Sequence, residues 1–286
     1  MLLYSVFNGF IVGIFYALMA LGLSLILGLN GVINFAQGTF MALGGYFAYT
    51  LEPYVGFWGA LILAPLVAVV LGLITERILI RPLYGRDPLF SLLLTFGLAM
   101  IIEDLVRTIW GAVGVPFSLP NYLNTPLSNS LFFLTGYRLV LIAITVVATG
   151  ALFAILRYSR IGIRIRAGNA DLETISSLGV NIFFLRAANF GIGIFLAGLA
   201  GILAAGQLGL SPDIGSALIM PSFVAIIVGG VGSLLGSVLG GLIIGVASGI
   251  TAAFFPAAQE VVIYVIMAVV LVVRPRGLFG QEGLFE

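Results

Sequence analysis

The stretch SVFNGFIVGIFYALMALGLSLIL, residues Ser5–Leu27, decides the fold class of this chain. It contains no charged side chain, and a bilayer crossing takes roughly 20 apolar residues. Because backbone amides find no water inside a bilayer, an apolar stretch of this length folds as a helix. Its hydrophobic residues do not alternate, which argues against a barrel strand, and it runs past the short apolar core of a cleaved signal peptide. We therefore expect it to be a first membrane span.

The same composition extends over all 286 residues, of which 61% are hydrophobic and 8% are charged. An average soluble domain carries roughly 25% charged residues, so composition excludes a soluble enzyme. The chain has no Cys, no His and no Lys, since all its basic residues are Arg. Thiolate chemistry and a Walker A phosphate loop are therefore excluded. The net charge of +1 gives no reason to expect nucleic acid as a partner.

Long intervals without charged residues divide the rest of the chain into further spans. We expect an all-α, polytopic transmembrane helix bundle of about eight or nine spans, with a broken or re-entrant glycine-rich segment. The expected spans are Ser5–Leu27, Asn34–Leu51, Phe57–Thr75, Leu89–Ile109, Arg138–Leu156, Phe183–Gly206 and Glu260–Val273, with the glycine-rich block Met220–Phe255 before the last.

The arginines predict the orientation. They cluster at Arg77–Arg86, at Arg157–Arg186 and at Arg274–Arg276, and by the positive-inside rule these three regions are cytoplasmic. The segment Gly111–Gly136 has no basic residue and is expected to be external. For the C-terminus to lie inside, the block Met220–Phe255 must enter the membrane and return. It can do so as a re-entrant hairpin or as two short spans.

Uncharged polar residues gather in Asn30–Gly45, NGVINFAQGTFMALGG. Polar groups inside a membrane usually face a cavity or a neighbouring helix. One interpretation is a broken stretch that lines a solute path; the other is a turn followed by a helix whose polar residues are hydrogen-bonded. The residues alone do not separate the two. The candidate path residues are Asn30, Asn34, Gln37 and Thr39.

The segment Arg157–Phe184 is the only long polar stretch expected in the cytoplasm. Asn169 or Asp171 can cap a short helix, and Gly179 can end it. Such a helix could dock in a groove of a soluble partner, or the segment could be a basic anchor on anionic lipid. The sequence pattern leaves both open.

A third candidate is the group Glu103, Asp104 and Arg107, in which the arginine can pair with either acid along a helix. We favour a structural ion pair. No chain of intramembrane acids accompanies it, so a secondary transporter or channel driven by protons is poorly supported. A membrane-embedded enzyme would also have to work without His, Cys or Lys.

Several motifs together resemble one family, the permeases of branched-chain amino acid ABC importers. They match in order over nearly the whole chain, and they resemble the smaller, first-type permease more than its longer sister. The matching stretches are NGVINFAQGTFMALGGYFA (Asn30–Ala48), ERILIRPLYGRDP (Glu76–Pro88), RYSRIGIRIRAGNADLETISSLGVN (Arg157–Asn181), VGGVGSLLGSVLGGLIIG (Val228–Gly245) and RPRGLFG (Arg274–Gly280).

The resemblance implies a single permease domain over 1–286, in a bacterial or archaeal plasma membrane, with a cytoplasmic coupling loop at 157–182. It implies four kinds of partner: a second homologous permease, two cytoplasmic ATPase subunits that bind the ATP, an external solute-binding protein and the bilayer. No cofactor would bind to this chain itself. The residues implied to couple to the ATPase are Ala167, Asn169, Asp171, Glu173, Ile175, Leu178 and Gly179.

One departure from the family pattern concerns the substrate. After Asn-Phe-Ala the family commonly has His, Gly and Glu, whereas this chain has Gln37, Gly38 and Thr39. The local path would be less charged and less titratable. Branched-chain or other amino acids are the expected solutes, and urea or short amides, which relatives in the family carry, remain the alternative.

Overall fold

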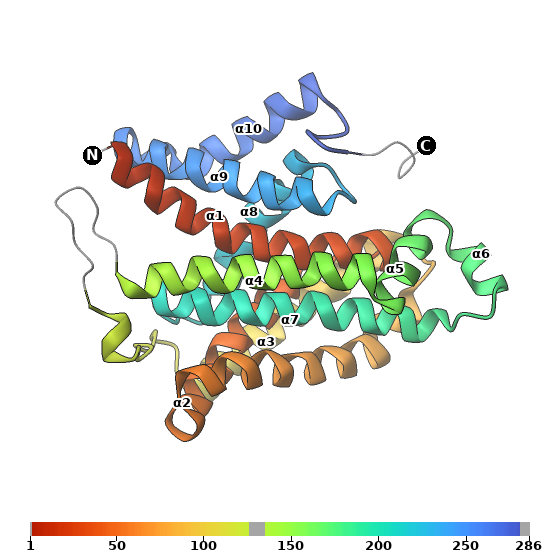
Figure 1. Cartoon of the computed structure of the whole chain (residues 1–286), viewed down its shortest axis with the longest axis horizontal. Coiled ribbons are helices and arrows are strands. Elements are labelled where there is room, and N and C mark those ends of the chain that lie inside the picture. Colours follow the sequence, from red (N-terminus) through yellow and green to blue (C-terminus); the bar gives the residue numbers. More distant parts are fainter. Residues whose placement is uncertain (1, 126–134, 281–286) are drawn as a thin grey trace.

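The computed structural model describes residues 2–125 and 135–280, and within them the regular structure is helical (Figure 1). Part of the segment Gly111–Gly136 and the last residues of the expected domain lie outside the described residues. Seven helical stretches in the described part are long and apolar enough to cross a membrane, which confirms the all-α polytopic bundle. The helices are α1 (Leu2–Leu25), α2 (Gln37–Thr75), α3 (Pro88–Trp110), α4 (Gly136–Tyr158), α5 (Arg160–Ala170), α6 (Leu172–Ser177), α7 (Ile182–Leu208), α8 (Ile214–Gly229), α9 (Leu234–Phe254) and α10 (Gln259–Val273).

Helix α2 is two spans joined at a sharp bend. Its 39 residues would measure about 58 Å if straight, nearly twice the hydrocarbon core. The backbone leaves helical geometry at Gly56, with φ 71° and ψ 171°. Only glycine adopts that conformation without strain, because it has no Cβ. The two arms agree with the separate spans predicted from the sequence on either side of this glycine.

The glycine-rich block forms two helices, α8 and α9, joined by a short turn (Figure 1). Glycines let α9 lie against α1: a Cβ on Gly9 would be 2.6 Å from the carbonyl oxygen of Gly245, and one on Gly13 would be 3.0 Å from that of Gly241. Because α9 runs antiparallel along α1, it reaches the end of the bundle where the chain starts. The block therefore contains two helices, of which α9 is long and apolar enough to cross a membrane, whereas the 16-residue α8 is short for a full span.

The three arginine clusters lie at one end of the bundle, here called the Arg-rich end. The guanidinium of Arg81 lies 5.4 Å from the ring centroid of Phe183, which brings the end of α2 next to the start of α7. The Leu278 amide donates to the carbonyl oxygen of Val228 at 2.9 Å, which ties the C-terminal segment to the end of α8. Figure 1 places α5 and α6 at this same end, away from the N-terminus. That the Arg-rich end is cytoplasmic stays a prediction of the positive-inside rule.

Candidate functional site

The break between α1 and α2 is the centre of the candidate site. Helix α1 ends in a wide π-helical turn, Ile26–Asn30, and the chain then runs non-helically over residues 31–36, here called the central segment. Gly31 starts it with φ 67°, and its amide donates to the carbonyl oxygen of Leu27 at 3.1 Å. Single π-helical turns are rare in proteins and frequently mark functional sites.

Substituting Gly31 should cost stability because the position is left-handed. We expect Gly31→Ala to lower the free energy of unfolding by about 1 kcal/mol, since a Cβ there meets no neighbour but strains the backbone. Gly97, in α3, is a matched control because a Cβ there also meets no neighbour while the backbone is helical. Thermal unfolding in detergent should show a lower midpoint for Gly31→Ala and not for Gly97→Ala. Equal midpoints for the two variants would contradict the left-handed conformation of Gly31.

Two of the predicted path residues hold the central segment against α7. The side chain of Asn34 donates to Oε1 of Gln37 at 3.2 Å, and Nε2 of Gln37 donates to the carbonyl oxygen of Gly193 at 2.8 Å. Both side chains are fully buried. The amide of Phe35 donates to Oγ1 of Thr95 at 3.1 Å, which ties the segment to α3 on its other side.

Asn30 belongs to a second polar cluster, nearer the Arg-rich end. Its Nδ2 donates to the hydroxyl of Tyr84 at 2.8 Å, and its Oδ1 accepts from Nδ2 of Asn189 at 2.9 Å. Tyr84 in turn donates to Glu76 at 3.0 Å. Burial, and then the neighbouring carboxylate of Glu76, raise the pKa of Tyr84, so the hydroxyl stays a donor at neutral pH. Asn30, Asn34 and Gln37 thus all bond within the bundle.

Glu76 is a buried carboxylate whose charge is compensated by Arg81. The guanidinium donates through Nη2 at 3.0 Å and through Nε at 3.3 Å to the two carboxylate oxygens. Arg186 covers the ring of Tyr84, with its guanidinium 4.4 Å from the ring centroid. Neither Glu76 nor Asn189 was among the residues predicted from the sequence to form a site. Glu76 could have been noticed as a single acid at the end of an apolar span, and Asn189 as a single amide within one.

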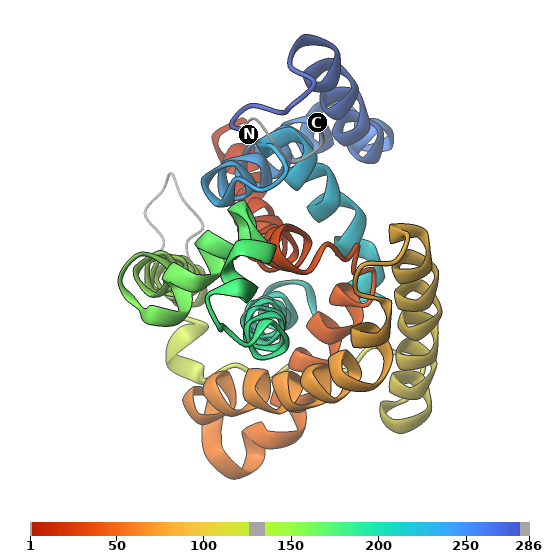
Figure 2. The same ribbon diagram turned by 90° about the vertical axis from the view of Figure 1, so that its right-hand side faces the viewer.

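Thr39, the remaining predicted path residue, lines a cavity of about 630 Å³ between α2, α3 and α8. Phe35 of the central segment lines it as well. Figure 2, which looks onto the Arg-rich end, shows α3 at the edge of the bundle and α1 with α7 at its centre. The cavity, which α3 lines, therefore lies toward the edge of the bundle. Further side chains that line this cavity include Phe96, Met100, Glu103, Asp104, Arg107, Ser216 and Ile219.

The charged group of α3 faces this cavity. Arg107 pairs with Glu103 at 2.5 Å, and the two side chains are 49% and 20% exposed. Asp104 is exposed, and its carboxylate has no hydrogen bond or ion pair to any residue in 2–125 or 135–280. The predicted ion pair is confirmed, but its place beside Thr39 was not expected. The spacing of Phe96, Met100, Glu103 and Arg107 along one helical face was the signal that could have revealed it.

The predicted coupling loop contains two helices instead of one. Asp171, extended at φ −157° and ψ 101°, separates α5 from α6 and caps α6 by accepting the amides of Glu173 and Thr174, both at 3.0 Å. Hydrogen bonds, first from the Thr174 hydroxyl and then from its amide, lower the pKa of Asp171. Gly179 follows α6 with φ 81°. The short helix is confirmed, with Asp171 as its cap.

The seven predicted coupling residues divide between a base and a tip. Ala167 and Asn169 lie at the end of α5, which rests on the π-helical turn of α1: a Cβ on Gly28 would be 3.2 Å from Nδ2 of Asn169. Leu178 lies at the tip and is 74% exposed. The remaining tip residues are Asp171, Glu173, Ile175 and Gly179. Their role in coupling stays a prediction.

Comparison with known proteins identifies the family. The family model described as branched-chain amino acid transport system / permease component matches residues 5–271. The high-affinity branched-chain amino acid transport system permease protein LivH of Salmonella typhimurium is 32% identical, over 98% of this chain and 96% of that protein. BraD of Pseudomonas aeruginosa, a permease protein with the same description, is 30% identical over 96% and 94%. LivM of Salmonella typhimurium is 29% identical over 76% and 57%. The chain belongs to the family of permease components of branched-chain amino acid transport systems.

Proposed function

We propose that this chain is one membrane subunit of an ATP-driven importer of branched-chain amino acids. In this proposal, the movement driven by the ATPase subunits reaches the chain through its α5–α6 loop. One observation carries the proposal: α5 rests on the π-helical turn that leads directly into the central segment. A displacement of the loop would therefore reach Phe35 and Thr39 through a few residues of backbone. These two residues line the cavity beside α3.

The cavity has the chemistry that an amino acid zwitterion requires. Phe35, Phe96 and Ile219 offer apolar surface for a branched side chain. Asp104 offers an unpaired carboxylate for the ammonium group, and Arg107 lies one turn further along α3 for the carboxylate. A charged group exposed on a membrane helix is costly unless it faces water or another protein, which favours an aqueous path on this side.

The partners follow from the same proposal. A second, related permease is part of the proposal because the chain is also similar to LivM, a permease protein of the same kind of system. It would cover the α3 side, where Asp104 and Arg107 are exposed. Two ATPase subunits would bind ATP and contact the α6 tip, and a solute-binding protein would deliver the amino acid at the opposite end. The membrane would be a bacterial or archaeal plasma membrane with the Arg-rich end, including the C-terminus, in the cytoplasm. This chain itself would catalyse no reaction.

Reconstitution tests the proposal. The chain is placed in liposomes with its second permease and its ATPase subunits, and uptake of radiolabelled leucine is measured with the binding protein outside. We expect uptake only when ATP is enclosed with the ATPase subunits. Leucine flux through the chain alone without ATP would instead favour a secondary transporter or channel. ATP-driven uptake of urea but not leucine would assign the alternative solute.

Neutralising Asp104 tests the cavity as the solute path. We expect Asp104→Asn to reduce leucine uptake about tenfold, because one charge-assisted hydrogen bond to the ammonium contributes about 1.5 kcal/mol. Glu260→Gln is the control, since Glu260 is also exposed but does not line the cavity. Leucine uptake by both variants is measured at a saturating concentration of the binding protein. An effect of equal size in both, or in neither, would reject this path.

A further inference from the structure

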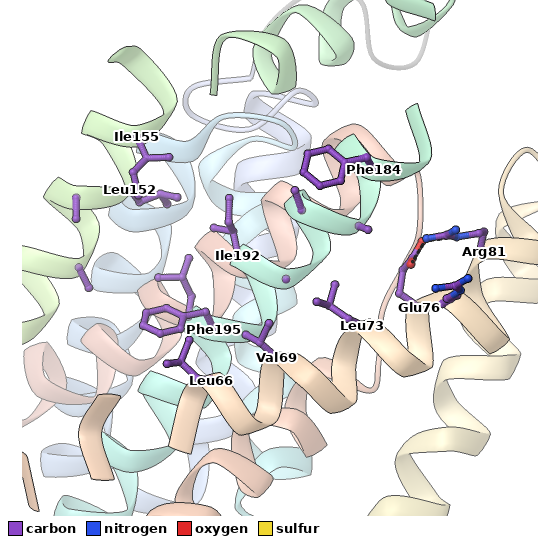
Figure 3. Close-up of a pocket in the computed structure, with 17 residues that line it drawn as sticks. Leu66, Val69, Leu73, Glu76, Arg81, Leu152, Ile155, Phe184, Ile192 and Phe195 are labelled. Atoms are coloured by element: carbon purple, nitrogen blue, oxygen red, sulfur yellow. Dashed lines mark hydrogen bonds and ion pairs between the residues drawn. The ribbon is translucent and has the colours of Figure 1, made fainter. Parts of the chain in front are cut away.

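A second cavity, of about 660 Å³, lies on the outer side of the bundle (Figure 3). Three helices line it: α2 through Leu66 and Leu73, α4 through Ile155, and α7 through Ile192 and Phe195. Figure 3 shows these side chains converging on one elongated space, with Glu76 and Arg81 at one end of it. We call this cavity the outer groove, because it lies at the periphery of the helix bundle. It is separate from the α3 cavity of the proposed function, with which it shares no lining residue.

The length of the outer groove corresponds to one leaflet of a bilayer. Its wall along α2 and the start of the π-helical turn that follows (Glu76–Ile80), from Leu66 to Arg77, measures about 16 Å at 1.5 Å per residue. Half of the hydrocarbon core is about 15 Å. On the α7 side the groove is lined by the small residues Ala187, Ala188 and Gly191, which leave space between the helices. The groove thus begins near the middle of the membrane and ends at the Arg-rich surface.

Charge is confined to the surface end of the groove. Arg81 is compensated by Glu76, whereas Arg77 is exposed and has no hydrogen bond or ion pair to any residue that the structure describes. The groove end therefore carries one uncompensated positive charge. The other lining residues are apolar.

We propose that the outer groove binds an anionic phospholipid of the Arg-rich leaflet, with an acyl chain between α2, α4 and α7 and the phosphate at Arg77. Apolar walls one leaflet long with a cation only at the surface end match a molecule with one charged head and an apolar tail. A transmembrane helix of a partner fits less well, because it would need about 30 Å and polar surroundings at both ends. The lipid would fill the space between α4 and the rest of the bundle.

Lipid retention tests the proposal on the full-length chain. The protein is extracted into detergent with equal amounts of phosphatidylglycerol and phosphatidylcholine, and native mass spectrometry counts the lipids that stay bound. We expect one phosphatidylglycerol retained in preference. Arg77→Gln should reduce that preference about fivefold, the factor for about 1 kcal/mol per basic residue near a membrane surface. Arg86→Gln, a change of an exposed arginine outside the groove, should leave it unchanged.

A substitution that fills the groove provides a second test. Ala151, on α4, lines the groove, whereas Ala154 on the same helix is exposed and does not. We expect Ala151→Phe to abolish selective retention and Ala154→Phe to preserve it. Equal retention of the two lipids by the unchanged chain would overturn the proposal. So would identical behaviour of the two phenylalanine variants, or loss of the second permease from the complex with Ala151→Phe while lipid retention stays intact.

Discussion

Leu178→Glu is expected to reduce ATP-driven leucine uptake at least tenfold while the protein still inserts and folds. Leu178 is 74% exposed at the tip beyond α6, so its side chain contributes little to the stability of this chain. Burying a leucine side chain in an apolar groove of a partner contributes about 2 kcal/mol, which corresponds to about a thirtyfold change in affinity. Placing a carboxylate at that point adds the cost of desolvating a charge.

The control for Leu178→Glu is Val113→Glu, at the opposite end of the bundle. Val113 is also a strongly exposed apolar residue outside the helices. ATPase binding should be normal in Val113→Glu, whereas in Leu178→Glu ATPase binding and uptake should be lost together. Full transport by Leu178→Glu, or a loss of equal size in both variants, would contradict contact between the α6 tip and an ATPase subunit.

Arg81→Met is expected to be strongly destabilising, at about 3–5 kcal/mol. It would leave the carboxylate of Glu76, which is fully buried, without its counter-charge. Arg107→Met is the matched change at the other ion pair. Because both partners there are partly exposed, breaking that pair should cost less than about 1 kcal/mol. Thermal unfolding in detergent should separate the two variants clearly.

Removing the buried charge should rescue Arg81→Met. In Glu76→Gln combined with Arg81→Met, a neutral amide replaces the carboxylate and can still accept the hydrogen bond from Tyr84. We expect this double variant to recover most of the lost stability. Similar unfolding midpoints for Arg81→Met and Arg107→Met, or no recovery in the double variant, would show that the Glu76–Arg81 pair does not carry the effect.

Much of the candidate site was predictable because local patterns determine it. Apolar length predicted the spans, and the acid at position 171 with the glycine at 179 predicted a short helix in the polar loop. The division of that loop into α5 and α6 was missed, because Asp171 can continue a helix or cap one. Asn34 and Gln37 were equally ambiguous: an amide within a membrane segment can face a path or bond to a neighbouring helix, and here both amides bond to each other or to α7.

The sequence by itself determined that this protein is a helical membrane protein, roughly where most of its spans lie, and that a short capped helix occurs in its polar loop. The physical reason is that hydrophobic length, charge spacing and helix caps act within a few turns of chain. Only the tertiary structure decided which polar residues meet. Asn30 bonds to Asn189, Gln37 bonds to the backbone at Gly193, and Thr39 shares a cavity with Asp104, and these partners are far apart along the chain. Such contacts depend on how whole helices pack, which no local pattern specifies.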